Sequence, residues 1–142
     1  MCKFLGFAVL FSSLLLVSIL GCTKSNPASN GGINQLTLGT GLNASNPFLL
    51  VGESTTFTGV PATIYFRLES KDDMGGSAVI IALSKMVGGV YTADTTIIYP
   101  SIQSYGTIFL SAFTIRTTGS YQAVGILQTG NKTIASVDFT VQ

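Results

Sequence analysis

The 142-residue sequence contains no histidine and no tryptophan, and it has only two cysteines. The missing histidine removes the commonest general base and the commonest metal ligand, which disfavours most hydrolases and zinc enzymes. Charge is also scarce, because seven Lys and Arg and six Asp and Glu make up only 9% of the chain. Without a basic footprint, nucleic acid is not an expected partner. The 46% hydrophobic content predicts a folded chain rather than a disordered one.

The N-terminal residues have the parts of an export signal. Lys3 precedes an apolar run that is interrupted only by Ser and Gly, and a polar stretch follows at 23–32. One positive residue, an apolar core and a small residue before the break are typical of a secretory signal peptide. The alternative is an uncleaved transmembrane helix, since residues 4–21 are at the short end of the roughly 17–25 that span a bilayer.

The end of this run resembles the lipobox of bacterial lipoproteins through its sequence Ile19-Leu20-Gly21-Cys22. The resemblance implies that the Cys22 thiol receives a diacylglycerol, that a peptidase cuts just before it, and that the new amino group is acylated, with palmitate as a typical acyl group. Several acyl chains anchor a protein stably where one binds only marginally. Thr23 stands where an Asp would retain a Gram-negative lipoprotein in the inner membrane, so the resemblance implies the outer membrane. It leaves the membrane leaflet open.

These features divide the chain into a signal peptide at 1–21, which is expected to be a helix, a lipidated flexible linker at 22–32 and one domain at 33–142. The linker is rich in Ser, Asn and Gly, a composition that gives flexible coils. Cys2 would leave with the signal and Cys22 would carry the lipid. No thiol then remains for a disulfide, a metal site or a nucleophile.

From residue 33 onward the sequence predicts an all-β domain. Short apolar and β-branched runs alternate with turn residues, and 17 Thr follow Cys22, which suits half-exposed strands. The clearest alternation covers Ala62–Glu69, with Ile64, Phe66 and Leu68 on one face. Further strands are expected at 54–59, 77–85, 90–92, 95–99, 107–115, 120–128 and 133–141. The 107–115 segment is apolar on both faces and is expected to be a central strand, and the last two strands are expected to form a hairpin.

Seven to nine short strands at this spacing indicate an antiparallel β-sandwich. Within it, Thr118-Gly119-Ser120-Tyr121-Gln122-Ala123 resembles the Gly-x-Tyr-x-Cys segment at the start of strand F in immunoglobulin-like domains. The resemblance implies an immunoglobulin-like or fibronectin-III-like fold, with Tyr121 as a corner residue whose hydroxyl bonds back to the backbone. Ala123 replaces the cysteine and the core Trp is missing, as in many bacterial modules of this kind. Another sandwich or a small barrel is the alternative.

Three carboxylates near one turn are the candidates for metal binding. Glu69, Asp72 and Asp73 could offer oxygen ligands to Ca²⁺, which takes six to eight of them. Their spacing matches no calcium-binding loop and Lys71 lies among them, so a solvated turn is the favoured interpretation.

A nucleophilic Ser would need an activating base, and the sequence has no Ser-x-x-Lys motif. We therefore expect neither an enzyme nor a cofactor.

Two further groups of residues suggest binding or modification. The tyrosines Tyr65, Tyr91, Tyr99 and Tyr105 could stack on sugars, although rings with a polar tip also serve as ordinary sandwich residues. Asp94-Thr95-Thr96 resembles the acceptor triplet of a bacterial O-glycosylation system, which implies Thr95 as a modification site. The expected function is a non-catalytic binding or structural module, anchored to the membrane through Cys22 and contacting envelope protein or glycan. The alternative is a surface glycan-binding lipoprotein of a polysaccharide-uptake system.

Overall fold

The computed structural model describes residues 32–100 and 106–142. The expected signal helix, the lipobox with Cys22, most of the linker and Tyr105 lie outside the described residues.

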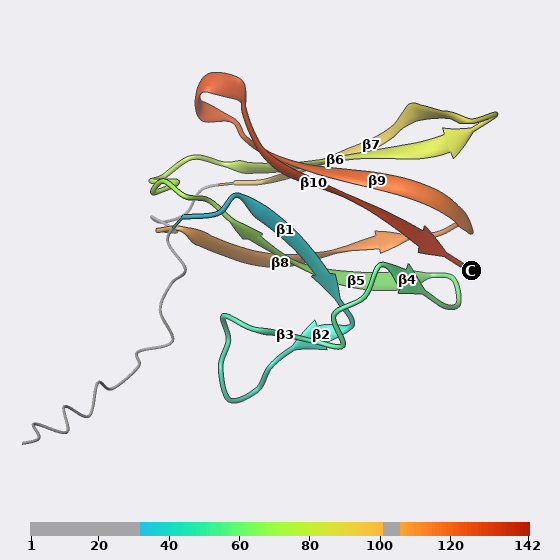
Figure 1. Cartoon of the computed structure of the whole chain (residues 1–142), viewed down its shortest axis with the longest axis horizontal. Coiled ribbons are helices and arrows are strands. Elements are labelled where there is room, and N and C mark those ends of the chain that lie inside the picture. The colour runs from blue at the N-terminus through green and yellow to red at the C-terminus, as the bar shows by residue number, and fades with distance from the viewer. Residues whose placement is uncertain (1–31, 101–105) are drawn as a thin grey trace, which may run out of the picture.

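Two sheets pack face to face in the described part of the chain (Figure 1). The three-stranded sheet has the order β1 (Gln35–Gly39), β5 (Ala62–Glu69), β8 (Ile108–Ile115). The five-stranded sheet has the order β4 (Thr56–Phe57), β10 (Lys132–Val141), β9 (Gly119–Leu127), β6 (Val79–Val87), β7 (Val90–Tyr99). A separate hairpin pairs β2 (Gly41–Leu42) with β3 (Leu50–Val51), and a short 3-10 turn, η1 (Thr129–Asn131), joins β9 to β10.

The strand order is that of an immunoglobulin-like sandwich. Lettering β1, β5, β6, β7, β8, β9 and β10 as A, B, C, C′, E, F and G gives the sheets ABE and GFCC′. All pairings among these strands are antiparallel. The two residues of β4 run parallel to the end of β10. This short parallel pairing differs from the antiparallel sandwich that the sequence predicts. The all-β, immunoglobulin-like prediction is confirmed.

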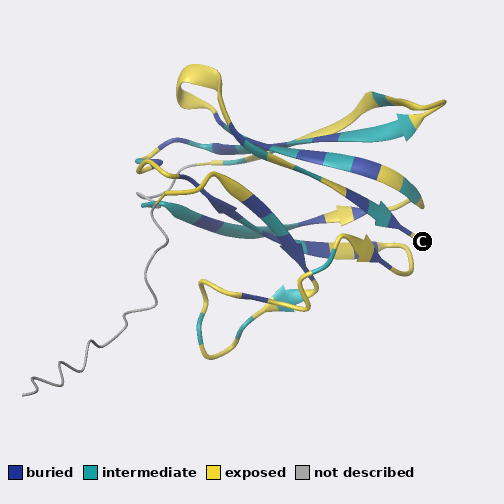
Figure 2. Ribbon diagram, viewed as in Figure 1, coloured by how far each residue is buried: buried dark blue, intermediate teal, exposed yellow. Residues whose placement is uncertain are grey.

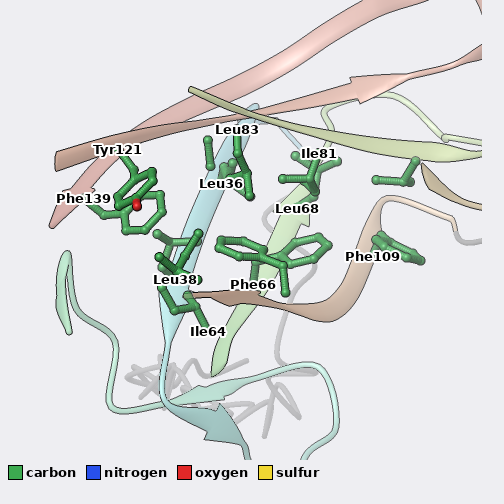
Figure 3. Packing of buried hydrophobic residues seen from close by; sticks show 14 of the residues in the cluster. Leu36, Leu38, Ile64, Phe66, Leu68, Ile81, Leu83, Phe109, Tyr121 and Phe139 are labelled. Carbon is green, nitrogen blue, oxygen red and sulfur yellow. The ribbon is translucent and has the colours of Figure 1, made fainter. Parts of the chain in front are cut away.

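Alternating side chains fill the space between the sheets. Ile64, Phe66 and Leu68 of β5 are fully buried, as their period of two predicts, and they belong to one core cluster with Ile81 and Leu83 of β6 (Figure 3). Phe66 lies at the centre of an aromatic group, with ring centroids 5.4–5.9 Å from those of Tyr99, Phe109 and Phe113. Burying each side chain of this size contributes roughly 1.5–3 kcal/mol. Figure 2 shows the same alternation of buried and half-buried residues along β9.

Tyr121 forms the corner at the start of β9. Its hydroxyl donates to the carbonyl oxygen of Thr117 at 2.9 Å, and it lies 2.7 Å from the hydroxyl of the same residue. Its ring stacks on Phe139 at 5.4 Å between centroids, and the Lys85 ammonium lies 5.4 Å from the ring centroid. The backbone contact is the one that the resemblance to strand F implies.

Two expectations about strands were wrong. The segments 90–92 and 95–99 are one continuous strand, β7, because a β-bulge at Asp94 absorbs the break in the alternation. The 107–115 segment contains β8, which is an edge strand of the three-stranded sheet rather than a central one. Its outward residues Ile108, Leu110 and Ala112 are half-buried at that edge. An apolar strand can lie at an edge because the side-chain pattern reports burial of the faces and not the position within the sheet.

The β2–β3 hairpin packs on the outer side of the three-stranded sheet. Gly39 makes the close approach possible, because a Cβ there would lie 2.8 Å from the carbonyl oxygen of Val51 and 3.1 Å from Cβ of Leu50. The backbone N–H and the hydroxyl of Thr40 both donate to that same carbonyl, at 2.8 and 3.2 Å. Leu50 is buried by this contact, while the rest of the hairpin projects away from the sandwich (Figure 1).

Candidate functional site

The three candidate metal-binding carboxylates are each engaged in a different way. Glu69 is buried on β5 and accepts from the Arg67 guanidinium at 2.6 Å. Asp72 is exposed and pairs with the Lys132 ammonium at 2.8 Å, which lowers the pKa of Asp72. Asp73 accepts from the backbone N–H of Gly75 at 2.6 Å in the turn. No group of three His, Cys, Asp or Glu among the described residues is arranged to hold a metal ion.

The described tyrosines do not form a single row. Tyr65 lies half-buried on the outer side of β5, and Tyr91 lies on the outer side of β7. Tyr99 points into the sandwich, where its ring packs against Phe66 and its hydroxyl donates to the carbonyl oxygen of Ala112 at 2.8 Å. Burial raises the pKa of Tyr99, which accords with a structural role. Of the described candidates, Tyr65 and Tyr91 are therefore the ones placed to meet a ligand, and they lie on opposite sheets.

Thr95 lies on the exposed edge strand of the five-stranded sheet, beside the bulge at Asp94. Its hydroxyl donates to a carboxylate oxygen of Asp94 at 3.4 Å. The acceptor hydroxyl that the triplet implies is thus on an exposed strand, and its modification stays a prediction.

The outer surface of the five-stranded sheet, which we call the five-strand face, carries rows of apolar side chains. Residues opposite one another in a ladder share a face. One row joins Ile98, Ile80 and Ile126 across β7, β6 and β9, and the next row joins Thr96, Ala82 and Val124. Ile98 is 56% exposed, and Ile80 and Ile126 are half-buried. The isoleucine row therefore exposes apolar surface at one end of the five-strand face.

The other end of the five-strand face is polar. Ala93, Ser84, Gln122 and Asp138 form the row there, and the Gln122 amide donates to Asp138 at 2.9 Å. Partial desolvation, the charge of Asp138 and a hydrogen bond to its carboxylate raise the pKa of the Tyr91 phenol. Asp138 is the one charged residue in these three rows. The phenol, amide and carboxylate can each make directional hydrogen bonds to a ligand.

A shallow groove of about 430 Å³ runs beside β1 on the edge of the sandwich. It is lined by β1 residues, by Val137 and by the segment 53–55. Glu53 is the one carboxylate in this lining, so the groove holds no acid–base pair.

Sequence reasoning missed both the apolar rows and the hairpin tip. Ile80, Ile98 and Ile126 lie at outward positions, where alternation predicts polar residues, and this mismatch was the available signal. Phe48 and Leu49 precede Leu50 in an apolar run next to Asn43 and Asn46, whose side chains favour turns. That combination could have indicated a hairpin with an apolar tip.

Among known proteins, this chain is similar to solved structures only in its fold. No family model matches the chain, and no curated protein matches it. A solved structure of an immunoglobulin-like protein from Pseudomonas aeruginosa is similar over 77% of this chain and 93% of that one, with 11% identity and a TM-score of 0.48. The fold assignment rests on the strand order and register described above. The described residues include no helix with the length and apolar character to cross a membrane.

Proposed function

We propose that this protein is a lipid-anchored component of a bacterial envelope that binds a partner protein through its five-strand face. The apolar rows at 80, 98 and 126 are the observation that carries the binding role. Contiguous apolar surface that is exposed on a folded domain commonly marks an interaction site. The partner surface is expected to be apolar and uncharged, because the rows offer a single carboxylate for charge pairing.

The anchor is supported by the order of residues at the N-terminus. A positive residue, an apolar run and Gly21-Cys22 followed by a polar linker suit lipidation better than a plain membrane span. Intact-mass analysis of the protein from a Gram-negative host tests this. The expected product begins at Cys22 and carries acyl mass, which the Cys22→Ser variant lacks. A full-length chain without lipid would exclude the anchor.

The binding role is tested by capture from detergent-solubilised envelope and identification of the bound protein. We expect the double variant Ile80→Thr/Ile98→Thr to lose the partner, because it replaces apolar contact area with hydroxyls on the five-strand face. Leu110→Thr, on the outer side of the three-stranded sheet, is the matched control and should keep the partner. Equal capture by all three proteins would contradict the assignment of this face.

A glycan ligand is the second candidate, and the polar end of the five-strand face favours it. The Tyr91 ring can stack on the apolar face of a sugar while Gln122 and Asp138 bind its hydroxyls. A glycan array with the wild-type protein and with Tyr91→Ala tests this function. Binding that Tyr91→Ala loses but Ile98→Thr keeps would favour a glycan over a protein.

A further inference from the structure

The tip of the β2–β3 hairpin exposes large apolar side chains. Leu42, Phe48, Leu49 and Val51 are 41–56% exposed, although Leu50 beside them is buried against the sandwich. They project from the outer side of the three-stranded sheet, opposite the five-strand face (Figures 1 and 2). The hairpin therefore presents a second apolar surface that the proposed binding face does not use.

Several backbone N–H groups of this tip are hydrogen-bonded within the hairpin. The Asn43 side chain accepts from the N–H groups of Ser45 and Asn46 at 2.8 and 3.1 Å. The Asn46 side chain accepts from the N–H of Phe48 at 3.0 Å, and the Asn46 carbonyl accepts from the N–H of Leu49 at 3.0 Å. An unpaired backbone group is costly to move into an apolar medium. This tip can leave water with those N–H groups already paired.

The hairpin is also uncharged, and so is the chain that leads to it. No Asp, Glu, Lys or Arg occurs between Lys24 and Glu53. A partner recognised by charge would find nothing to pair with here, whereas the interfacial region of a lipid bilayer accepts an uncharged apolar tip.

The linker is long enough to bring the hairpin to a membrane. Residues 22–32, fully extended, span at most about 35–40 Å, and the five residues of β1 cover about 17 Å between the linker and the hairpin. A lipid on Cys22 would therefore hold the hairpin within reach of the bilayer surface.

We propose that the β2–β3 hairpin lies in the interfacial region of the bilayer, with Phe48 and Leu49 among the lipid head groups and upper acyl chains. This inference rests on the proposed lipid anchor for proximity to the membrane. Burial of such side chains reaches about 5–10 Å into the boundary between head groups and acyl chains. The contact orients the domain so that its five-strand face points away from the membrane.

The absence of tryptophan from the chain gives a direct test, since one substitution introduces a unique fluorophore. Phe48→Trp places an indole at the tip, and Val90→Trp places one at the 66% exposed first residue of β7 as the control. Both lipidated full-chain proteins are reconstituted in phosphatidylcholine vesicles, with and without brominated acyl chains. We expect a blue-shifted emission, quenched by bromine, for Phe48→Trp and neither effect for Val90→Trp.

Each other outcome overturns the proposal in a recognisable way. If both proteins float with the vesicles but Phe48→Trp is not quenched, the anchor stands and the hairpin contact is excluded, which leaves a protein as the occupant of the tip. If both indoles are quenched equally, the domain touches the bilayer without a preferred side. If neither protein floats with the vesicles, the anchor itself fails, and the hairpin contact fails with it.

Discussion

The two outer surfaces of the sandwich differ in the side chains that they carry and in how far the chain covers them. The outer side of the three-stranded sheet carries a largely buried ion pair, Arg67–Glu69, and is partly covered by the β2–β3 hairpin. The five-strand face is bare and presents isoleucines where polar residues are expected. The side with the ion pair is therefore partly closed by the chain itself, and the side with the isoleucine row is left open. This difference indicates that the first surface is structural and that the second is available to a partner.

Breaking the ion pair should have the largest effect. Glu69→Ala leaves the Arg67 guanidinium with 18% side-chain exposure and no carboxylate, and its Nε already lacks a partner among the described residues. We expect the free energy of unfolding to fall by about 3 kcal/mol, at the low end of the range for a buried pair that loses one partner. Urea denaturation measures it. Asp72→Ala breaks the exposed pair with Lys132 and should change far less, and equal losses would remove the contrast between buried and exposed charge.

Detaching the hairpin should have the next largest effect. Gly39→Ala pushes a methyl group into the Val51 carbonyl oxygen and Leu50, so we expect a loss of roughly 1–3 kcal/mol and faster proteolysis within 43–49. Gly41→Ala is the matched control, because nothing lies within 4 Å of a Cβ at that position. If the two variants were equally stable and equally resistant to protease, the hairpin would not be held by the contact at Gly39.

Changing the open face should barely alter stability. Ile98→Thr modifies a 56% exposed side chain, and we expect the free energy of unfolding to stay within about 0.5 kcal/mol. The same variant should bind the envelope partner more weakly in the capture assay. A large loss of stability would instead make the isoleucine row part of the structure, like the outer side of the three-stranded sheet.

The smallest effect concerns alkaline pH at the polar end of the five-strand face. The folded protein raises the pKa of Tyr91 above its ordinary value of 10.0, so the neutral phenol stabilises the fold below that pH. This contribution is lost as pH rises through the raised pKa, because partial desolvation and the neighbouring Asp138 carboxylate both disfavour the phenolate. Ultraviolet absorbance titration should show late phenol transitions for Tyr91 and Tyr99. Asp138→Asn should shift the Tyr91 transition to lower pH and leave the Tyr99 transition in place. A titration that Asp138→Asn leaves unchanged would exclude the carboxylate as a cause.

The two-residue alternation of apolar side chains and the turn-forming residues between the strands predicted much of this fold. The alternation of Ala62–Glu69 is the alternation seen in β5, and the hairpin around Thr129-Gly130-Asn131-Lys132 is present as β9 and β10. The six residues around Tyr121 pointed to the fold because the corner is a local motif. The lateral position of β8 was not predictable, because side-chain pattern is the same at the edge and in the centre when the faces are covered.

The candidate surfaces were less accessible to sequence reasoning for a physical reason. Ile80, Ile98 and Ile126 are 46 residues apart at the extremes and become neighbours only through the registers of β6 with β7 and β9. The hairpin depends on Gly39 meeting Val51, which lies 12 positions further along the chain. Surfaces assembled by long-range pairing need the topology before they can be recognised.

The bulge at Asp94 affects how the free edge of β7 can pair with another molecule. β7 is a ten-residue edge strand, and the unpaired backbone of such a strand is a template for the edge of another molecule. The bulge twists this edge and places a carboxylate in its middle, so two copies cannot zip together along their full length. The proposed lipid anchor would bring copies together in two dimensions, where a straight edge would favour edge-to-edge pairing. A single extra residue in one strand thus makes β7 a poorer template for such pairing.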